Sequence, residues 1–373
     1  MSHNTIEINL TALTENYAAI QRKVGPNVKI LAMVKSDGYG HGLVQVAQAV
    51  AGVGASSFGV AEVEEGIALR DAGISGEIVV LLGSAAYREI IHYALSPVVF
   101  DADNLVGLSE AALVQGRQVG VHLKIDVGMG RLGIMPRQVP SFLQMIAGLP
   151  GVFLAGVMGH LPVADDPAAA QLTSDQCGHF IHLTLGQSNL HIANSAALID
   201  YPASLLHMVR PGISLYGCYP SGYLECRGQL VLRPAMSFKT RIIQVKDVPA
   251  GHGVSYGHLF VTERPSRLAV LPVGYADGYL RALTGHAEVL VRGRRVPVCG
   301  RICMNACLID ITDIEGARVD EEVVLMGSQV ADGKAAQGAP ITADEIAAWM
   351  GTINYEVLCL FGRNNKRLYT TKV

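Results

Sequence analysis

Residues 29–42 read Lys-Ile-Leu-Ala-Met-Val-Lys-Ser-Asp-Gly-Tyr-Gly-His-Gly. This stretch joins a short apolar run, bounded by Lys29 and Lys35, to a loop that is rich in glycine. An apolar run without alternating polar residues is typical of a strand buried on both faces of a parallel sheet. The glycines let a ligand approach the backbone closely. Lys35 is therefore either a lysine at a functional site or a strand-end lysine that points into water.

Short apolar runs of the same kind recur along the chain with helix-like segments between them. They are Ile30–Val34, Phe58–Ala61, Ile78–Leu82, Pro97–Phe100, Val121–Ile125, Leu154–Met158, Leu190–Ala193 and Leu206–Val209. After the second run, Glu64 and Glu65 begin a helical segment that Gly73 ends. Strands that alternate with helical crossovers in this number predict an α/β fold, a (β/α)8 TIM-type barrel. A doubly wound open sheet is the alternative, but the chain has no glycine-rich dinucleotide turn.

The pattern changes after about residue 230. The strand-like segments now have short polar connections and are Ser237–Val248, Arg267–Val273, Glu288–Val298, Cys307–Ile311 and Val323–Met326. Gly293 and Arg294 fit a tight hairpin turn. Thr342 and Glu345 form a possible capping box before a helix. We therefore predict a barrel domain over residues 1–232 and a mostly β domain over residues 233–373.

Composition narrows the class of protein. A net charge of −3 argues against nucleic acid as the main partner. No charge-free apolar stretch is long enough to span a membrane, and the first residues lack the features of a secretory signal. The seven cysteines are odd in number and scattered, which suits a reducing cytoplasm. Cys299, Cys303 and Cys307 do not match a zinc spacing, so we predict no metal site.

The polar residues that follow the predicted barrel strands form a candidate site. Active sites of such barrels lie at the carboxyl ends of the strands, and phosphate is often bound after the last two strands. The residues at or after these strand ends are Lys35, Lys124, Arg131, His160, Asn194, Ser195, Arg210, Gly212 and Ile213. A lysine that can form a Schiff base, together with a phosphate site, suggests pyridoxal phosphate as the cofactor.

At these residues the chain closely resembles the alanine racemases. The segments that carry the resemblance are 34–42 (Val-Lys-Ser-Asp-Gly-Tyr-Gly-His-Gly), 124–133 (Lys-Ile-Asp-Val-Gly-Met-Gly-Arg-Leu-Gly), 191–197, 209–217, 254–257, 272–281 and 300–304. They span nearly the whole chain in order, so the match is specific. The resemblance implies a barrel with a C-terminal β domain, pyridoxal 5'-phosphate as cofactor, and a homodimer whose active sites are shared between subunits.

The resemblance implies that two residues are catalytic. Lys35 would bind the cofactor covalently and act as the base on one face of the substrate Cα. Tyr256, supplied by the partner subunit, would act on the opposite face. Racemisation removes a proton from one face and delivers one to the other, so two bases that flank a planar centre are reasonable. Without the resemblance, Tyr256 would be read as a tyrosine of a Ser-Tyr-Gly turn.

The resemblance also assigns the arginines and their neighbours. Arg210 would face the pyridine nitrogen, with His191 supporting it from behind; the alternative is a surface ion pair of Arg210. Arg131 would contact the cofactor and then the substrate carboxylate. Lys124 would orient Arg131 either as a carbamate or as a plain lysine donor.

The remaining implied residues divide by role. Tyr39, Ser195, Gly212 and Ile213 would hold the phosphate. His160 and Asn194 would line the cofactor. Tyr275 and Met304 would bind substrate across the dimer interface, with Arg281 behind them.

These features predict a cytoplasmic, homodimeric racemase that interconverts L- and D-alanine and supplies D-alanine for peptidoglycan. Ser36 and Gly38 stand where the family usually has alanine, Asn305 replaces an aspartate, and residues 361–367 depart from the usual tail. Racemisation of serine or another small amino acid is therefore an alternative. A decarboxylase with a similar barrel and a non-catalytic cofactor-binding protein are less favoured, because both leave Tyr256 without a role.

Overall fold

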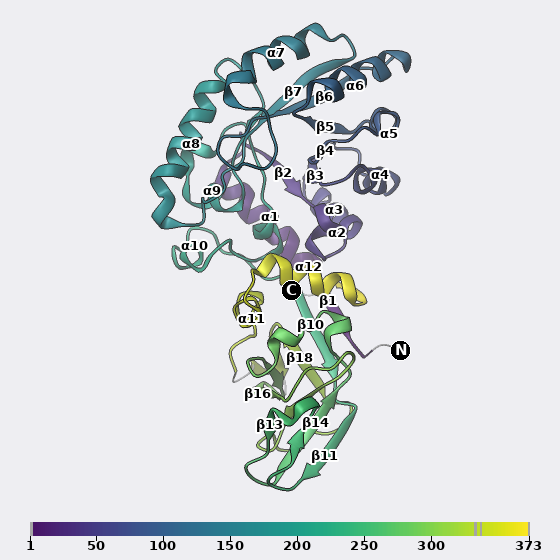
Figure 1. Ribbon diagram of the computed structural model, residues 1–373, viewed down its shortest axis with the longest axis vertical. Helices are drawn as coiled ribbons and strands as arrows, with labels where there is room; N and C mark the ends of the chain where they lie inside the picture. The colour runs from purple at the N-terminus through teal and green to yellow at the C-terminus, as the bar shows by residue number, and fades with distance from the viewer. Residues whose placement is uncertain (1–2, 332–333, 336–337, 372–373) are drawn as a thin grey trace. The chain divides into compact units, whose positions relative to one another are not determined.

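The computed structural model describes residues 3–331, 334–335 and 338–371 (Figure 1). The chain forms two compact units. The barrel unit consists of Ala12–Gly38 and Leu43–Arg233. The strand unit consists of the residues up to Thr11, the short segment Tyr39–Gly42, and the chain from Pro234 onward.

Within the described residues of the barrel unit, eight parallel strands form one sheet in the order β8-β7-β6-β5-β4-β3-β2-β9. They are β2 (Lys29–Met33), β3 (Ser57–Val60), β4 (Glu77–Val80), β5 (Ser96–Val99), β6 (Val119–Lys124), β7 (Val152–Met158), β8 (Leu190–His191) and β9 (Met208–Val209). The backbone N–H of His207 donates to the carbonyl of Leu190 over 3.1 Å, which links the two end strands. The sheet is thus a nearly closed barrel, and the predicted fold class is confirmed.

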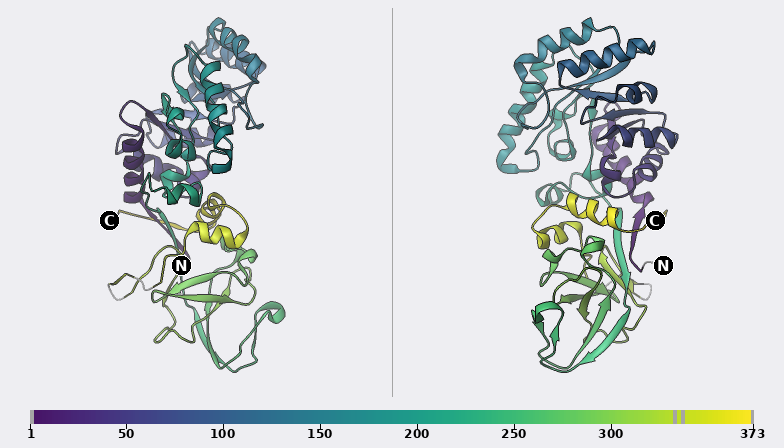
Figure 2. Two further views of the ribbon diagram at one scale, coloured as in Figure 1. Left: turned by 90° about the vertical axis from the view of Figure 1, so that its left-hand side faces the viewer. Right: turned by 45° about the vertical axis from the view of Figure 1, so that its right-hand side comes forward.

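Helices surround the strands of this unit (Figures 1 and 2). They are α1 (Leu10–Val24), α3 (Leu43–Ala51), α4 (Val63–Asp71), α5 (Tyr87–His92), α6 (Ala102–Val114), α7 (Val139–Gly148), α8 (Ala170–Leu183), α9 (Ser195–Asp200) and α10 (Gly222–Cys226). The Glu65 carboxylate caps α4 by accepting the N–H of Ala61 over 2.8 Å. Gly73 follows this helix with φ +85°, the left-handed conformation that ends helices.

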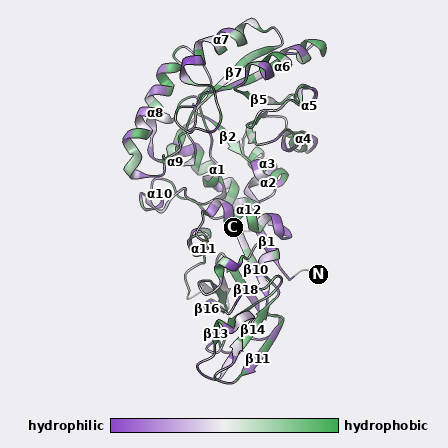
Figure 3. Cartoon of the chain, viewed as in Figure 1, coloured by the Kyte–Doolittle hydropathy of each residue, from purple (hydrophilic) through white to green (hydrophobic). Residues whose placement is uncertain are grey.

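The strands are apolar because helices and the barrel interior cover both of their faces. Leu31, Val79 and Val121 are completely buried. Hydrophobic residues, in green, dominate strands such as β7 in Figure 3, whereas α4 and α8 carry hydrophilic residues as well. This pattern explains the continuous apolar runs of the sequence.

Among the described residues of the strand unit, the main sheet has nine strands in the order β11-β14-β17-β16-β15-β18-β10-β1-β21. The strands expected from the sequence are β10 (Met236–Arg241), β11 (Gln244–Val248), β14 (Ser266–Leu271), β15 (Glu288–Val291), β16 (Arg294–Cys299), β17 (Cys307–Asp310) and β18 (Glu322–Met326). Short strand pairs are β12 (Gly253–Val254) with β13 (Phe260–Val261) and β19 (Val330–Ala331) with β20 (Lys334–Ala335). Two helices, α11 (Ala343–Met350) and α12 (Asn354–Asn364), complete the unit. Thr342 caps α11 as predicted, since its hydroxyl accepts the N–H of Glu345 over 3.1 Å.

Two strands of this sheet were missed by the sequence analysis. β1 (Thr5–Asn9) pairs antiparallel with β10 and parallel with β21 (Arg367–Thr370). Ile6 and Ile8 are fully buried while their neighbours are partly exposed, so β1 does alternate as a half-buried strand should. Five residues with two apolar side chains are a weak signal, and the partner strands lie far away in the sequence.

Gly362 of α12 packs directly on the backbone of Gly40, and a Cβ at position 362 would overlap the Gly40 carbonyl. We expect Gly362→Ala to destabilise the protein by about 3 kcal/mol, because backbone cannot move aside as a flexible side chain can. Chemical denaturation would measure the change. Gly178→Ala in α8 is the matched control, since a Cβ there meets nothing within 4 Å and should stabilise by about 0.5–1 kcal/mol. Equal stability of the two variants would contradict the packing argument.

Candidate active site

Lys35 follows β2 at the start of a left-handed turn. Ser36, Asp37 and Gly38 have φ values of 55°, 53° and 61°. The N–H of Gly38 donates to the Val34 carbonyl over 2.8 Å, and Asp37 accepts the N–H of Leu43 over 2.9 Å. A left-handed conformation costs roughly 1–2 kcal/mol for each residue with a side chain. Glycine at position 38 avoids that cost. This explains why glycine stands there in place of the alanine that is usual in the family.

Four basic side chains act electrostatically on His160. Burial is the main cause that holds the pKa of His160 well below its ordinary value. Nearby positive charges lower that pKa further, and they come from Arg210, Lys124, Arg131 and Lys35. His160 is therefore neutral at neutral pH. The four cations predicted from separate strand ends lie within electrostatic reach of one ring.

Lys124 ends β6 and is 5% exposed. Its Nζ has no hydrogen-bond partner within the described part of the chain. Burial, together with the charges of Arg210 and Arg131, lowers the pKa of Lys124 to about 7. A substantial fraction of this amine is consequently neutral at neutral pH.

Arg131 lies in a loop that Asp126 organises. The Asp126 carboxylate accepts the N–H groups of Gly128, Met129 and Gly130 over 2.9, 2.8 and 3.2 Å. At the base of the loop, the N–H of Ile134 donates to the Lys124 carbonyl over 2.9 Å. The loop therefore returns to the end of β6, and Arg131 stays exposed beside the barrel.

Arg210 follows β9 and is 4% exposed. Its Nη1 donates to Nδ1 and to the carbonyl of His191, over 3.1 and 2.8 Å. Its Nη2 donates to the carbonyls of Gly159 and Ile192, over 2.7 and 3.2 Å, and to Nδ1 of His160 over 3.3 Å. Nε–H has no partner in the part of the chain that the structure describes. Arg210 is not in a surface ion pair, and its Nε–H is available to a ligand.

Burial lowers the pKa of Arg210 to about 9, so the guanidinium keeps its charge at neutral pH. Burial and the charge of Arg210 also hold the pKa of His191 well below its ordinary value. Both histidines that contact Arg210 are therefore neutral and can accept its N–H groups.

Ser195, Gly212 and Ile213 lie together where α9 meets the end of β9. The Ser195 hydroxyl accepts the N–H groups of Gly212 and Ser214 over 2.9 and 3.3 Å. The Ser214 hydroxyl is buried and has no hydrogen-bond partner among the described residues. Ile213 begins a 3-10 turn, whose first N–H groups have no acceptor within the turn. The N–H of Ile213 and the hydroxyl of Ser214 suit a phosphate group, whereas the N–H groups of Gly212 and Ser214 already donate to Ser195. Ser214 was not singled out from the sequence.

Asn194 has a structural role as the cap of α9. Its side-chain oxygen accepts the N–H of Ala197, and its amide donates to the Leu161 carbonyl, each over 3.0 Å. These bonds join the start of α9 to the loop that follows His160.

Tyr39 belongs to the strand unit. It is buried, which raises the pKa of its phenol, and its ring centre is 6.2 Å from that of Tyr355. Tyr355 lies in the first turn of α12. Tyr355 was not singled out from the sequence.

Tyr256, Tyr275 and Met304 lie on neighbouring loops of the strand unit. The N–H of Tyr275 donates to the Cys303 carbonyl over 3.1 Å, and the hydroxyl of Ser255 donates to the Arg301 carbonyl over 2.6 Å. Tyr256 and Met304 are 71% and 56% exposed. We call the three loops around Tyr256, Tyr275 and Met304 the tyrosine surface.

Arg281 is exposed at the start of a 3-10 turn next to these loops. The Thr284 hydroxyl, just after this turn, accepts the N–H of Ile302 over 3.3 Å. Arg281 is thus connected to the loop that carries Met304.

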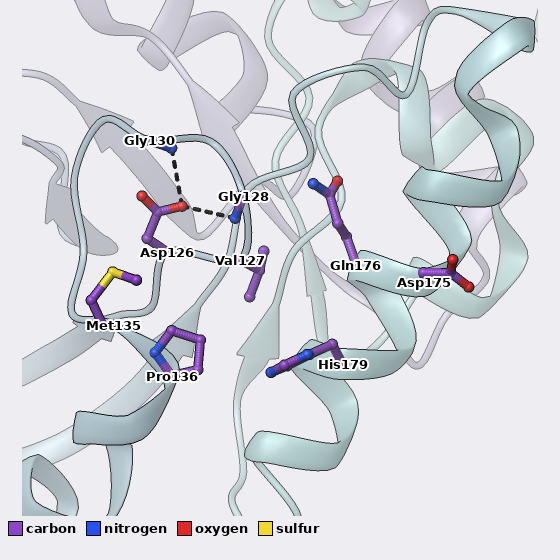
Figure 4. A pocket seen from close by; sticks show the side chains of 9 residues that line it. All are labelled: Asp126, Val127, Gly128, Gly130, Met135, Pro136, Asp175, Gln176 and His179. Carbon is purple, nitrogen blue, oxygen red and sulfur yellow. Dashed lines mark hydrogen bonds between the residues drawn. The ribbon is translucent and has the colours of Figure 1, made fainter.

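A cavity of about 510 Å³ lies between the Asp126 loop and α8 (Figure 4). Its lining residues are Asp126, Val127, Gly128, Gly130, Met135, Pro136, Asp175, Gln176 and His179. None of the predicted site residues lines it. The cavity borders the loop that carries Arg131 but does not contain the cation cluster.

The described residues contain no group of three or more His, Cys, Asp or Glu side chains arranged to hold a metal ion. All the cysteines lie in the described part of the chain as free thiols, Cys299, Cys303 and Cys307 among them. No helix in residues 3–331, 334–335 and 338–371 is long and apolar enough to cross a membrane.

The fold and this geometry define a (β/α)8-barrel enzyme whose candidate site lies at the carboxyl ends of the strands. Family models match the chain over residues 8–220, as the alanine racemase N-terminal domain, and over residues 235–369, as the alanine racemase C-terminal domain. The chain belongs to the alanine racemase family, and it is an isomerase that acts on a small amino acid.

Relatives of known name or structure cover nearly the whole chain. The chain is 43% identical to the alanine racemase of Syntrophobacter fumaroxidans over 371 residues, which are 98% of this chain and 96% of that protein. It is similar to the solved alanine racemase of Clostridium difficile 630, with a TM-score of 0.89, 34% identity and coverage of 99% and 96% of the two chains. For the enzyme from Streptomyces lavendulae the TM-score is 0.90, the identity 34% and the coverage 100% and 98%.

Proposed function

We propose that this protein interconverts L- and D-alanine with pyridoxal 5'-phosphate as cofactor, with Lys35 and the partner's Tyr256 as the two bases. The observation that carries the proposal is that Lys35, Lys124, Arg131 and Arg210 all act electrostatically on one buried histidine, His160. Such a site suits an anionic cofactor that carries a phosphate and a phenolic oxygen. When bound, pyridoxal phosphate withdraws electrons from the bonds at the substrate Cα, which makes the Cα proton removable.

The residues present fit this cofactor. Ser195, Gly212 and Ile213 would hold its phosphate, and the unpartnered hydroxyl of Ser214 supports a polar ligand at this place. Tyr39 remains a predicted phosphate ligand. His160 and Asn194 would line the ring.

The open Nε–H of Arg210 would donate to the pyridine nitrogen. A guanidinium has donors only, so it can satisfy only an unprotonated ring nitrogen. Such a ring withdraws electrons less strongly, which favours rapid return of the proton over side reactions.

Lys35 Nζ would take or return the proton on one face of Cα, and the Tyr256 oxygen of the partner would do so on the other. Lys35, Lys124, Arg131 and Arg210 all act electrostatically on His160, so Lys35 shares its surroundings with three other basic groups.

A homodimer would bring the tyrosine surface of one copy to the barrel of the other. Exposed apolar groups near Tyr256 support this assignment, since Leu259 and Val261 are 60% and 48% exposed. A cluster of this kind is typical of a surface that another chain covers. Tyr275 and Met304 would then contact substrate, with Arg281 behind them.

Arg131 would bind the substrate carboxylate, and Lys124 would orient it. We propose that Lys124 carries a carbamate, because a buried amine with a pKa of about 7 presents the neutral form that adds CO2. We expect protein equilibrated with ¹³C-bicarbonate to show a carbamate carbon signal by NMR. The signal should be absent in Lys124→Gln; a signal that persists in this variant would contradict the assignment.

A racemase of alanine would supply D-alanine for peptidoglycan. The free thiols of all the cysteines support a reducing compartment such as the cytoplasm.

The experiment that tests the function is circular dichroism with a panel of L-amino acids and the purified protein. We expect loss of optical activity with L-alanine, and faster loss with L-alanine than with L-serine. Preference for serine would instead point to Asn305 and the atypical tail. Release of CO2, or binding of cofactor without loss of optical activity, would contradict the racemase.

A further inference from the structure

Among the described residues, no carboxylate contacts the buried guanidinium of Arg210. Its hydrogen-bond partners in the described chain are three backbone carbonyls and the rings of His191 and His160. An uncompensated buried cation is unfavourable, the more so beside other cations. A negative charge is nevertheless connected to it through side chains.

The connection is a chain of hydrogen bonds through two buried histidines. Nε2 of His191 lies 2.9 Å from Nδ1 of His122, and Nε2 of His122 lies 3.1 Å from the Glu77 carboxylate. His122 and His191 are fully buried, and their rings meet edge to face. We call Glu77, His122 and His191 the histidine relay.

Only one arrangement of protons satisfies the relay. Arg210 can only donate, so Nδ1 of His191 must accept and its proton must lie on Nε2. That proton points at Nδ1 of His122, which must also accept. His122 therefore carries its proton on Nε2 and donates it to Glu77. A hydrogen bond from His122 is the main cause that lowers the pKa of Glu77, so this carboxylate is ionised at neutral pH.

The barrel backbone is adapted to hold His122. A Cβ at position 156 would lie 2.6 Å from His122 Nδ1, so only glycine leaves room for the ring there. The pairing of β6 with β7 shifts register between Val121 and His122. A register shift and a glycine that leaves room for one ring indicate that the local backbone is shaped to hold His122 at this position.

The relay also connects the two ends of the barrel. Glu77 is the first residue of β4 and its side chain is 31% exposed, whereas Arg210 follows the last residue of β9. The positive charge of Lys29 and a hydrogen bond from the Ser57 side chain act on the same carboxylate. Glu77 is thus held at the opposite end from the cation cluster.

We propose that Glu77 and His122 are positioning residues for Arg210, which support the proton arrangement that Arg210 requires of His191 and connect the buried guanidinium to a carboxylate at the far end of the barrel. This proposal rests on the proposed function, because Arg210 is the residue that would face the cofactor ring. Glu77 and His122 would influence the contact between Arg210 and the cofactor ring, although neither residue would touch the cofactor or the substrate.

The test uses two variants of Glu77 in the purified enzyme with its cofactor. Glu77→Gln removes the charge but keeps an acceptor, and Glu77→Met removes both. We expect kcat to fall about threefold in Glu77→Gln and about tenfold in Glu77→Met, with KM changed less than twofold. Glu15→Gln is the matched control, because it removes an exposed carboxylate of the same unit that pairs only with Arg233, and it should leave kcat unchanged.

Imidazole ¹⁵N NMR of the histidines provides a readout that does not depend on activity. The relay requires His122 and His191 to carry their protons on Nε2 in the unmodified protein, and the Nε2–H of His122 to lose its acceptor in Glu77→Met, which an upfield shift of the attached proton would show. A proton on Nδ1 of either ring in the unmodified protein would overturn the proposal. So would a folded Glu77→Met variant with unchanged kcat. Failure of the racemase function itself would appear separately, as unmodified protein that does not racemise alanine.

Discussion

Lys35→Ala is expected to abolish racemisation, with a loss of at least about 10³-fold, and to remove the visible absorption band of covalently bound cofactor. The amine at this position would both bind the cofactor and move one of the two protons, so no other lysine can replace both roles. Lys124, for example, is buried at the end of a different strand, where the charges of Arg131 and Arg210 act on it. Racemase assays and absorption spectra of the unmodified protein and of Lys35→Ala would measure the loss of activity and of the band.

Lys23→Ala is the matched control for this experiment. Lys23 lies near the end of α1 in the same unit, and its amine donates to Gln229 at the surface. We expect this variant to keep the absorption band and the activity. A Lys35→Ala protein that retained the band would place the cofactor on a different lysine.

Tyr256→Phe is expected to lower racemisation by about 10²–10⁴-fold, the usual contribution of a positioned acid or base. The equilibrium constant between enantiomers is fixed, so kcat/KM must fall equally in both directions. Exchange of the Cα hydrogen with solvent is not bound by this rule. It should persist for the enantiomer whose proton Lys35 removes and should be lost for the other, as deuterium incorporation would measure.

Tyr256 is 71% exposed, so removal of its hydroxyl should not affect folding. Tyr223→Phe, at an exposed tyrosine of the barrel unit, is the control and should be fully active. Equal exchange of both enantiomers by Tyr256→Phe would exclude the tyrosine from proton transfer.

Mixing the two inactive variants tests whether the site is shared. A heterodimer of Lys35→Ala and Tyr256→Phe chains has one site with both bases intact. Random exchange of subunits should therefore restore about a quarter of the normal activity, given half heterodimers with one working site of two. No recovery after exchange would indicate that both bases come from one chain.

The sequence was sufficient to predict the barrel, because its strands are buried on both faces and read as continuous apolar runs. Strand ends then located the candidate site, and the cations predicted from them do converge on His160. In the barrel sheet, strands that follow one another in the sequence are also neighbours in space. The arrangement of the barrel can therefore be predicted from the order of the strands alone.

Other features depend on contacts that sequence does not display. His122 occupies the middle of an apolar strand, and nothing local marks it as part of a relay with Glu77. In the left-handed turn, Ser36 has no special preference for this conformation, which aspartate at position 37 adopts more readily. Tyr355 acquires its contact with Tyr39 only through the association of distant segments.

The position of β1 in its sheet has a consequence for biosynthesis. This strand leaves the ribosome first, yet its neighbours are β10 and β21, which begin at Met236 and Arg367. At typical elongation rates of about 5–20 residues per second, β1 waits roughly 10–45 s for β10 and longer for β21. During that time its edges are open to pairing with other nascent chains. A chain that stalls before Arg367 never covers the second edge, so incomplete translation products of this protein should be especially prone to aggregate.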